Sequence, residues 1–588
     1  MTIEKSLTLR IGGEAGWGIA SAADIFSLIA IKLGYKVFAS KDYASQIRGG
    51  HNYHTVRISK QPVLADVDKV DILLALDQRT FDLHLKSVVK EGIILVDEKV
   101  KLEQKDNRIV LIPLKQIEEK LKEKNIHNAV FLGATAKCLG IEFNVLKEVI
   151  ARYFKEKAVL VEKITLAAKE GFNAVPTIKN SLLVGKLSGQ LPAGKVAVDK
   201  NMEQEFLTGN DTISKGALKA GLTFLAQYPM TPATGILHNL AQEAMTNKKL
   251  IVVQPEDEIA AINFAVGASA AGARAMTATS GGGFALMVET YGLAGMAEVP
   301  LVIIEGQRPG PATGLPTKTG QGDLKFVLSA APGDFPRVII APGDIGECYT
   351  ETKRAFYLAE KYQLPVMVLV DKHLCECFQT VNLSEIEKEF VFDYDKRINI
   401  IEKIGDKELN QDKIYRRYVD GNLSRPLPGN PQGIFTYAGD EHNEVGYITE
   451  DAEIAKKMNE RRMGKLDLIK KELPVVKLIG SKDADVTVVS WGSNKGVIIE
   501  ALGKLNKEGK KINFLPIKFM CPFQDEIKTI LEKIKQEKKL LVLVEANYSG
   551  QLGSLIREKT GIEIKDKFLR YDGKVFTVDD IYNKLKGL

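Results

Sequence analysis

The sequence predicts an α/β protein made of three α/β domains. Uninterrupted apolar runs such as "PLVIIEGQ" (300–307) and "LPVMVLVD" (364–371) have the length and composition of parallel strands buried on both faces. Helical stretches separate these runs, and a glycine-rich turn, "GGEAGWG" (12–18), follows the first strand. Strands that alternate with helices in this way form parallel sheets covered by helices.

The first domain is expected over residues 1–195. A strand at 7–13, the glycine-rich turn, a helix at 19–34 and a strand at 36–40 make up a β-loop-α-β unit. Near residue 195 the hydrophobic periodicity is lost, which is typical of a linker.

The second domain is expected over 205–375, where strands such as "RAMTAT" (274–279) alternate with helices as in a doubly wound sheet. The pattern breaks over 376–480, and the segment "GNLSRPLPGNPQG" (421–433) is rich in proline and glycine, so we expect a connecting arm there. Strand–helix alternation resumes over 481–588, the third domain.

Composition narrows the class of protein. The chain has 588 residues, of which 45% are hydrophobic and 27% charged, and its 81 basic and 75 acidic residues leave a net charge of only +6. Lysine and glutamate alternate over 115–125, which favours solvated helix faces over a nucleic-acid interface. No apolar run reaches the ~18 residues of a membrane span, and the first residues lack the pattern of a signal peptide. We therefore expect a cytoplasmic protein that contacts neither membrane nor nucleic acid.

The five cysteines are scattered, and only Cys375 and Cys377 lie close together. An iron–sulfur cluster needs four thiolates, usually in C-x-x-C spacing, and the chain has no such group. We expect reduced structural thiols and no bound metal.

The stretch "YPMTPATG" (228–235) holds one hydroxyl in a stiff turn. Pro229 and Pro232 fix φ and remove two backbone donors, so the residues between them cannot continue a helix. Thr231 is thereby held rigidly, which indicates a functional role for its side chain.

Several motifs together resemble one enzyme family. The segments 228–235, 256–287 and 305–324 resemble the α subunit of thiamine-diphosphate-dependent 2-oxoacid:ferredoxin oxidoreductases. The first domain, through "GGEAGWGIASAADIF" and "YASQIRGGHNYHTVRIS", resembles the γ subunit of that family, fused ahead of α. The motif "VEANYSGQLGSLI" (544–556) is similar to the transketolase-C-like domain that follows. The resemblance implies a transketolase-pyrimidine-like sheet over 205–375 and a transketolase-C-like domain over 481–588.

Glu258 is the carboxylate that the resemblance selects for contact with N1′ of thiamine diphosphate. The cofactor is activated by a carboxyl group that exchanges a proton with its aminopyrimidine ring. The residues alone allow another interpretation, because an acidic triplet is also common at the N-terminus of a helix, and here it would consist of Glu256, Asp257 and Glu258. The family's activating glutamate stands nine residues before a helix glycine, here Gly267, and this spacing singles out Glu258.

Arg308 follows a buried strand, at the edge where parallel sheets bind ligands. Its planar guanidinium suits the carboxylate of a 2-oxoacid, although an ordinary surface arginine is the alternative. The resemblance makes Arg308 the substrate arginine and sets the Thr231 hydroxyl against the same substrate, so the catalytic set is Glu258, Thr231 and Arg308.

The coenzyme A side is expected in the first domain. In the family the γ domain helps to build the coenzyme A pocket, and "QIRGGHNYH" (46–54) places Arg48 and Gly49 beside a histidine-rich strand, so these two residues are the expected contacts. A structural turn with a salt bridge is the alternative. The turn "TSGGGF" (279–284) suits either phosphate binding or a tight turn.

A partner chain is expected because two cofactor motifs are missing. Thiamine enzymes bind Mg²⁺ and the diphosphate through a GDG motif, and no GD pair of this chain is followed by glycine. The resemblance implies a β subunit that carries Mg²⁺, thiamine diphosphate and a [4Fe–4S] cluster, in a heterodimer or a dimer of heterodimers. The implied reaction converts a 2-oxoacid and coenzyme A reversibly to acyl-coenzyme A, CO₂ and reduced ferredoxin.

Two other functions remain open on the residues. One is a non-catalytic nucleotide-binding or scaffold protein with a degenerate thiamine-enzyme fold. The other is a stand-alone transketolase-like enzyme, which the missing GDG motif disfavours. The segment "EHNEVG" (441–446), similar to a family stretch, is expected near the mouth of the active site.

Overall fold

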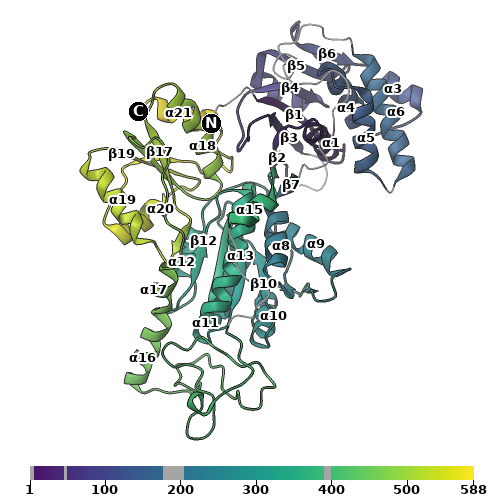
Figure 1. Cartoon of the computed structure of the whole chain (residues 1–588). Coiled ribbons are helices and arrows are strands. Elements are labelled where there is room, and N and C mark those ends of the chain that lie inside the picture. The colour runs from purple at the N-terminus through teal and green to yellow at the C-terminus, as the bar shows by residue number, and fades with distance from the viewer. Residues whose placement is uncertain (1–5, 46–49, 156, 176–203, 390–398) are drawn as a thin grey trace. The chain divides into compact units, whose positions relative to one another are not determined.

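The computed structural model describes residues 6–45, 50–155, 157–175, 204–389 and 399–588. Arg48 and Gly49, the expected coenzyme A contacts, lie outside these residues. Within them the strands form three sheets, of eight, seven and five strands (Figure 1). The predicted α/β class with several parallel sheets is confirmed.

Contacts divide the chain into two compact units. Unit 1 contains Met1–Phe206, Cys377–Asn382 and Phe576–Leu588, and unit 2 contains Leu207–Glu376 and Leu383–Val575. Two short segments that are distant in sequence thus belong to the first unit. The contacts define only these two units, so the finer division into four segments, expected from the sequence, remains a prediction.

Unit 1 is built on the eight-stranded sheet, in the order β6-β5-β4-β1-β3-β2-β14-β7. The strands β1, β4, β5 and β6 are parallel, whereas β3 is antiparallel to both β1 and β2. The strands are β1 (Leu7–Glu14), β2 (Lys36–Asp42), β3 (His51–Ser59), β4 (Val70–Ala75), β5 (Val88–Asp97), β6 (Ile109–Ile112), β7 (Glu205–Thr208) and β14 (Phe378–Val381).

Helices cover this sheet, and two of them meet at backbone distance. A Cβ on Gly133 of α4 would overlap the carbonyl of Ala168 in α6, and one on Gly171 would overlap that of Val130. Glycine at both positions therefore permits the close α4–α6 contact. The helices are α1 (Ile19–Lys32), α2 (Gln78–His84), α3 (Leu114–Leu121), α4 (His127–Cys138), α5 (Phe143–Tyr153), α6 (Ala158–Ala174) and α21 (Val578–Lys586), with a 3-10 turn, η1 (Leu85–Ser87).

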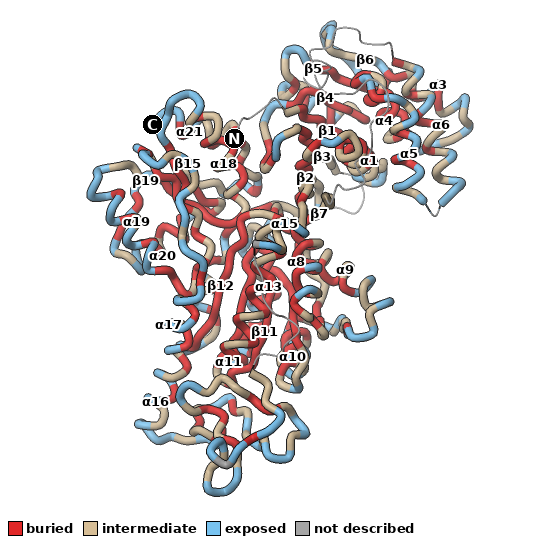
Figure 2. The backbone as a smooth tube through the Cα atoms, in the orientation of Figure 1, coloured by how far each residue is buried: buried red, intermediate tan, exposed pale blue. Residues whose placement is uncertain are grey.

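Unit 2 contains the seven-stranded sheet, in the order β18-β12-β13-β11-β10-β8-β9. All neighbours are parallel except β18, which runs antiparallel to β12. Every residue of the central strands β11 and β13 is buried, as the uninterrupted apolar runs predict (Figure 2). The strands are β8 (Phe224–Ala226), β9 (Ile251–Val253), β10 (Ala275–Thr279), β11 (Leu301–Gln307), β12 (Val338–Ile340), β13 (Pro365–Asp371) and β18 (Phe519–Cys521).

The same unit holds the five-stranded sheet, in the order β15-β17-β16-β19-β20, with only β15 antiparallel. Its strands are β15 (Ile479–Gly480), β16 (Val486–Ser490), β17 (Ile512–Pro516), β19 (Leu540–Glu545) and β20 (Asp566–Leu569). The helices of unit 2 are α8 (Gly209–Lys219), α9 (Thr234–Ala244), α10 (Glu258–Ala270), α11 (Gly281–Met296), α12 (Leu324–Ser329), α13 (Ile345–Tyr362), α14 (Lys372–Glu376), α15 (Leu383–Glu389), α16 (Ala452–Met463), α17 (Lys465–Lys470), α18 (Asn494–Lys507), α19 (Asp525–Gln536) and α20 (Gln551–Thr560), with η2 (Asp406–Glu408). None of the helices in the described parts of the chain has the length and hydropathy needed to cross a membrane.

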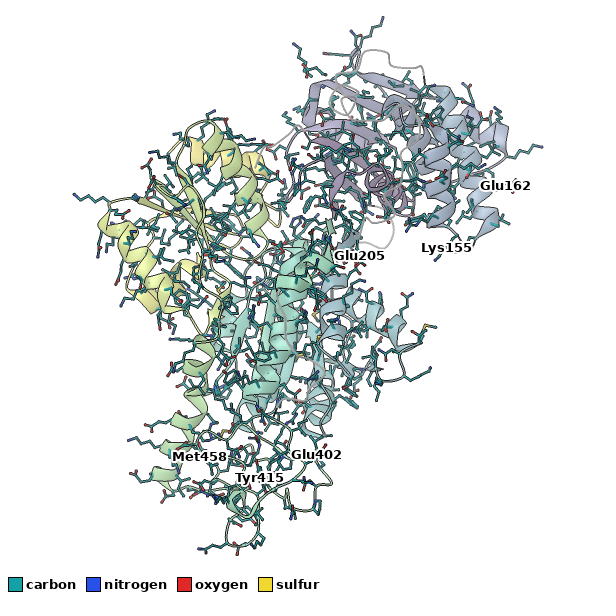
Figure 3. All side chains as sticks on the ribbon, in the orientation of Figure 1. Lys155, Glu162, Glu205, Glu402, Tyr415 and Met458 are labelled. Carbon is teal, nitrogen blue, oxygen red and sulfur yellow. The ribbon has the colours of Figure 1, made fainter. Side chains whose placement is uncertain are left out.

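Within the expected arm, residues 399–451 are largely irregular, and α16 and α17 follow them. Buried charges join this region to the seven-stranded domain: Arg461 and Lys465 pair with Glu298, and Arg425 pairs with Glu360. Tyr415, labelled with Met458 in Figure 3, is fully buried within the arm.

The segment 441–446 makes structural contacts within this region. Glu441 pairs with Arg462 of α16 at 2.5 Å, and the ring of His442 lies against Tyr418 with centroids 4.3 Å apart. Glu444 pairs with Arg416. These contacts give the segment a role in shaping the arm.

Candidate active site

Thr231 and Arg308 are brought together at the carboxyl edge of the seven-stranded sheet. The turn that carries Thr231 follows β8, and Arg308 follows β11. Arg308 Nη1 donates a hydrogen bond to the backbone carbonyl of Thr231 at 2.9 Å. Gln227, fully buried at the start of the turn, donates to the carbonyl of Ala233 at 2.9 Å and so closes the turn on itself. The rigid turn expected from the two prolines is therefore fastened to the predicted substrate arginine.

Glu258 is the first residue of α10 and the one buried carboxylate of its acidic triplet. Glu256 is exposed, and Asp257 caps the helix by accepting from Ala260 N at 2.8 Å. The side chain of Glu258 is only 4% exposed, and its Oε1 accepts no hydrogen bond from any residue that the structure describes. A buried acceptor without a donor is costly, so such an atom at a sheet edge marks a place where a ligand can donate.

Glycine at the start of α11 makes room for this carboxylate. A Cβ on Gly283 would stand 2.7 Å from Cγ and 2.9 Å from Oε1 of Glu258, and it would overlap Thr279 Oγ1. The Thr279 hydroxyl in turn points at the sulfur of Met230, 3.9 Å away, in the turn that holds Thr231. Glu258 and the Thr231 turn are thus linked through β10 and α11, and Gly281 and Gly283 of "TSGGGF" serve close packing here.

Two carboxyl groups lie behind Arg308, and sequence reasoning missed both. Glu305 is fully buried, and no N–H or O–H group among the described residues donates to it. Its carboxyl is within hydrogen-bonding reach of Asp323, and two carboxyl groups can share such a bond only when one is protonated. Burial, reinforced by Asp323, raises the pKa of Glu305 well above its ordinary value, and burial raises the pKa of Asp323 to about 6. Burial and the neighbouring Asp323 thus both favour the neutral form of Glu305 over the charged one.

Burial also lowers the pKa of Arg308, and the nearby Asp323 and Glu305 oppose that shift. For Glu305 the sequence signal was a charged residue inside an apolar run. Asp323 follows a glycine in a loop and carries no comparable signal.

In unit 1 a chain of polar side chains includes His51, the first residue of β3 and two positions after Gly49 in the sequence. His51 Nε2 and His84 Nε2 are 2.8 Å apart, and Arg10 Nη1 lies 3.3 Å from His84 Nδ1. Because arginine can only donate, His84 Nδ1 accepts, and His84 Nε2 carries the proton given to His51. Burial lowers the pKa of both rings, that of His84 to about 3, so both are neutral at pH 7.

The five cysteines, all in described parts of the chain, form no disulfide bond, and Cys138, Cys348, Cys375 and Cys377 are buried.

The chain is similar over nearly all of its length to curated proteins of one family. The 2-oxoacid:ferredoxin oxidoreductase subunit alpha of Sulfolobus sp is 32% identical over 640 residues, which cover 98% of this chain and 96% of that protein. The chain belongs to the 2-oxoacid:ferredoxin oxidoreductase alpha-subunit family. It is thus a subunit of an oxidoreductase, as the motifs indicated.

Two family models, a second curated relative and a solved structure support the same family assignment for this alpha subunit. The family model described as "Pyruvate flavodoxin/ferredoxin oxidoreductase, thiamine diP-bdg" matches residues 215–460, and the model "Pyruvate ferredoxin/flavodoxin oxidoreductase" matches residues 8–174. The 2-oxoglutarate synthase subunit KorA of Methanocaldococcus jannaschii is 34% identical and covers 60% of this chain and 90% of its own. The solved 2-oxoglutarate:ferredoxin oxidoreductase from Magnetococcus marinus is 29% identical, covers 99% of both chains and superposes with a TM-score of 0.84.

Proposed function

We propose that this alpha subunit acts in a cytoplasmic complex that oxidises a 2-oxoacid and transfers the acyl group to coenzyme A. The carboxylate of the substrate leaves as CO₂, and the two electrons released pass to ferredoxin. The Magnetococcus marinus enzyme, similar over the whole chain, was solved with 2-oxoglutarate, coenzyme A and succinyl-CoA bound. The same classes of ligand are therefore proposed here.

The observation that carries this proposal is the buried, unpartnered Oε1 of Glu258. It suits an aminopyrimidine ring, whose N1′ can share a proton with a carboxyl group, and the matching family model over 215–460 is a thiamine-diphosphate-binding one. When bound, thiamine diphosphate supplies the nucleophilic carbon for the oxo group and takes up the electrons left behind by CO₂. Glu258 would hold and move the proton at N1′, and its burial keeps water from competing for that proton.

Arg308 and Thr231 would bind the oxoacid. A guanidinium can grip a carboxylate with two hydrogen bonds, and the bond from Arg308 to the Thr231 carbonyl fixes the guanidinium relative to the turn. The Thr231 hydroxyl, held in that turn, would donate to the substrate without an ordering cost at each turnover.

A partner subunit would cover the apolar surface beside Glu258. The helices α10 and α11 are rich in apolar residues on their exposed as well as their buried faces, which favours contact with another chain. Phe264 and Leu286 are 49% and 53% exposed, and Ile259 and Leu293 are also exposed. The occupant we propose is the β subunit that binds Mg²⁺ and the diphosphate and carries a [4Fe–4S] cluster, because Glu258 needs a cofactor held from outside this chain. The assembly would be a heterodimer or a dimer of heterodimers.

The segment 1–195 would supply the coenzyme A side, with Arg48 and Gly49 as contacts. The segments 205–375 and 481–588 would be the pyrimidine-binding-like and transketolase-C-like domains, joined by the arm 376–480.

Reconstitution tests the proposal. The purified chain should be colourless and free of iron, and should decarboxylate no 2-oxoacid. Addition of the partner subunit should give activity, and steady-state assays with pyruvate, 2-oxobutyrate and 2-oxoglutarate would then identify the substrate. A brown, active preparation of this chain alone would contradict the division of labour, and an inactive reconstituted complex would favour a scaffold with a degenerate fold.

A further inference from the structure

Gln321 lies where the carboxyl ends of the two sheets of unit 2 meet. It lies near the end of the loop 309–323, which follows Arg308, and its side chain is fully buried. Parallel strands place their carboxyl ends at one edge of a sheet, so β11 and β13 contribute one edge and β16 and β19 the other.

Every polar group of Gln321 is bonded to the five-stranded domain. Its backbone N–H donates to the Ala546 carbonyl at 2.8 Å, and its own carbonyl accepts from Asn547 Nδ2 at 3.0 Å. The side-chain Oε1 accepts from Asn494 Nδ2 at 2.8 Å and from Ala546 N at 3.0 Å. The Nε2 group donates to the Trp491 carbonyl at 3.1 Å. The three side-chain bonds, which need an acceptor and a donor on one planar group, specify an amide at this position.

The five-stranded domain holds Gln321 where open parallel sheets usually bind ligands. Such sheets bind ligands beyond the carboxyl ends of their strands. Here β16 ends at Ser490 and β19 at Glu545, and the residues just beyond both ends bind Gln321. Gly492 is shaped to it, with φ of 59° and space for no side chain, since a Cβ would stand 2.7 Å from Gln321 Nε2.

The residues after Gln321 continue the attachment toward Arg308. Gln551 Nε2 donates to the Gly322 carbonyl at 2.6 Å, and Gln551 Oε1 accepts from Lys325 N at 2.9 Å. Asp323 N donates at 3.1 Å to Oε1 of Gln307, the residue that precedes Arg308 in the sequence. The far end of the loop is thus fastened to the five-stranded domain and to the strand that carries Arg308.

We propose that Gln321 is a positioning residue, through which the five-stranded domain holds the loop 309–323 and keeps Arg308 oriented toward the oxoacid. The inference rests on the proposed binding of the substrate carboxylate by Arg308. A loop fixed at both ends loses little freedom when substrate binds, and small displacements of a binding group cost large factors in rate. The five-stranded domain therefore contributes to substrate binding without touching the substrate.

The test is Gln321→Ala in the assembled complex, compared with Gln524→Ala. Gln524 is also buried and donates one bond, to the Pro474 carbonyl at 2.8 Å, away from the loop. We expect Gln321→Ala to lower kcat/KM for the 2-oxoacid about 10- to 100-fold and to leave KM for coenzyme A unchanged. Gln524→Ala should leave both unchanged. Equal kcat/KM values for the two variants would overturn the proposal.

A milder variant and a double-mutant cycle complete the test. Gln551→Ala removes two bonds to the same segment at a partly exposed position and should give a smaller decrease of the same kind. In the cycle, Gln321→Ala should cost much less in an Arg308→Lys background than in the parent, because it acts through Arg308. Full additivity would show that Gln321 acts elsewhere. Unchanged kinetics of Arg308→Lys alone would instead show that the substrate assignment itself has failed.

Discussion

Two of the buried glutamates of unit 2, Glu298 and Glu258, have opposite surroundings. Glu298 is fully buried and pairs with Arg461 and Lys465. Glu258 is almost as buried, yet its Oε1 has no donor among the residues that the structure describes. A carboxylate surrounded by cations stabilises the fold that brought them together, whereas one left without a partner is available for a ligand. The difference separates the region that holds the arm from the region that we propose carries the chemistry.

The largest effect expected is on turnover in Glu258→Gln. The amide keeps the size and position of the side chain but cannot exchange a proton at N1′, so kcat of the reconstituted complex should fall about 10²- to 10⁴-fold. The free energy of unfolding should not decrease, because a buried carboxyl group without a donor is replaced by a neutral one. A large loss of stability with little loss of turnover would show that Glu258 is a structural residue, as Glu298 is, and that the two glutamates do not differ in role.

Glu298→Gln should have the reverse pattern. The change leaves Arg461 and Lys465 buried without their counter-charge, which should lower the free energy of unfolding by about 3 to 5 kcal/mol in denaturant titrations. The matched control is Glu444→Gln, which also removes the charge from two ion pairs, with the partly exposed Arg416 and Lys457, and should cost less than about 1 kcal/mol. Similar losses of stability in the two variants would show that the buried ion pairs of Glu298 contribute no more than the partly exposed pairs of Glu444.

Arg308→Lys tests the substrate end of the site. Lysine keeps the charge but loses the planar, two-point contact, so kcat/KM for the 2-oxoacid should fall about 10- to 100-fold. Normal steady-state kinetics with each 2-oxoacid would place Arg308 away from the substrate.

The smallest effect expected is a pH dependence from Asp323. Burial raises the pKa of Asp323 to about 6, so the group loses its charge as the pH falls through that value. Arg308 then has less negative charge beside it and attracts the substrate carboxylate more strongly. KM for the 2-oxoacid should decrease about three- to tenfold between pH 7.5 and 5.5. In Asp323→Asn the change should disappear, with KM low at both pH values; a persistent inflection near pH 6 would assign it to another group.

The sheets and the candidate residues at strand ends could be predicted because their signals are local. Uninterrupted apolar runs indicate parallel strands, and the carboxyl ends of such strands meet at one edge. Thr231 and Arg308 are in contact there for that reason. Burial then separates Glu258 from Glu256 and Asp257, which the sequence alone leaves equivalent.

Partners distant in sequence could not be predicted. Gln321 bonds to residues 170 to 226 positions away, and nothing in a glycine-rich loop indicates which domain it will contact. In the same way, Cys377–Asn382 adds a strand to the sheet of unit 1 although the neighbouring residues belong to unit 2. Glu441 lies in a motif expected near the active site, but its partner is Arg462 of α16.

Hydrogen–deuterium exchange at C2 of thiamine diphosphate tests the role of Glu258 most directly, because it reports activation of the cofactor without substrate. The exchange rate would be measured by NMR in complexes reconstituted with the parent chain, Glu258→Gln and Glu256→Gln. We expect exchange to slow about 10²- to 10⁴-fold in Glu258→Gln and to match the parent in Glu256→Gln, whose carboxylate is exposed. Parent-like exchange in Glu258→Gln would show that another group activates the cofactor and would contradict the account.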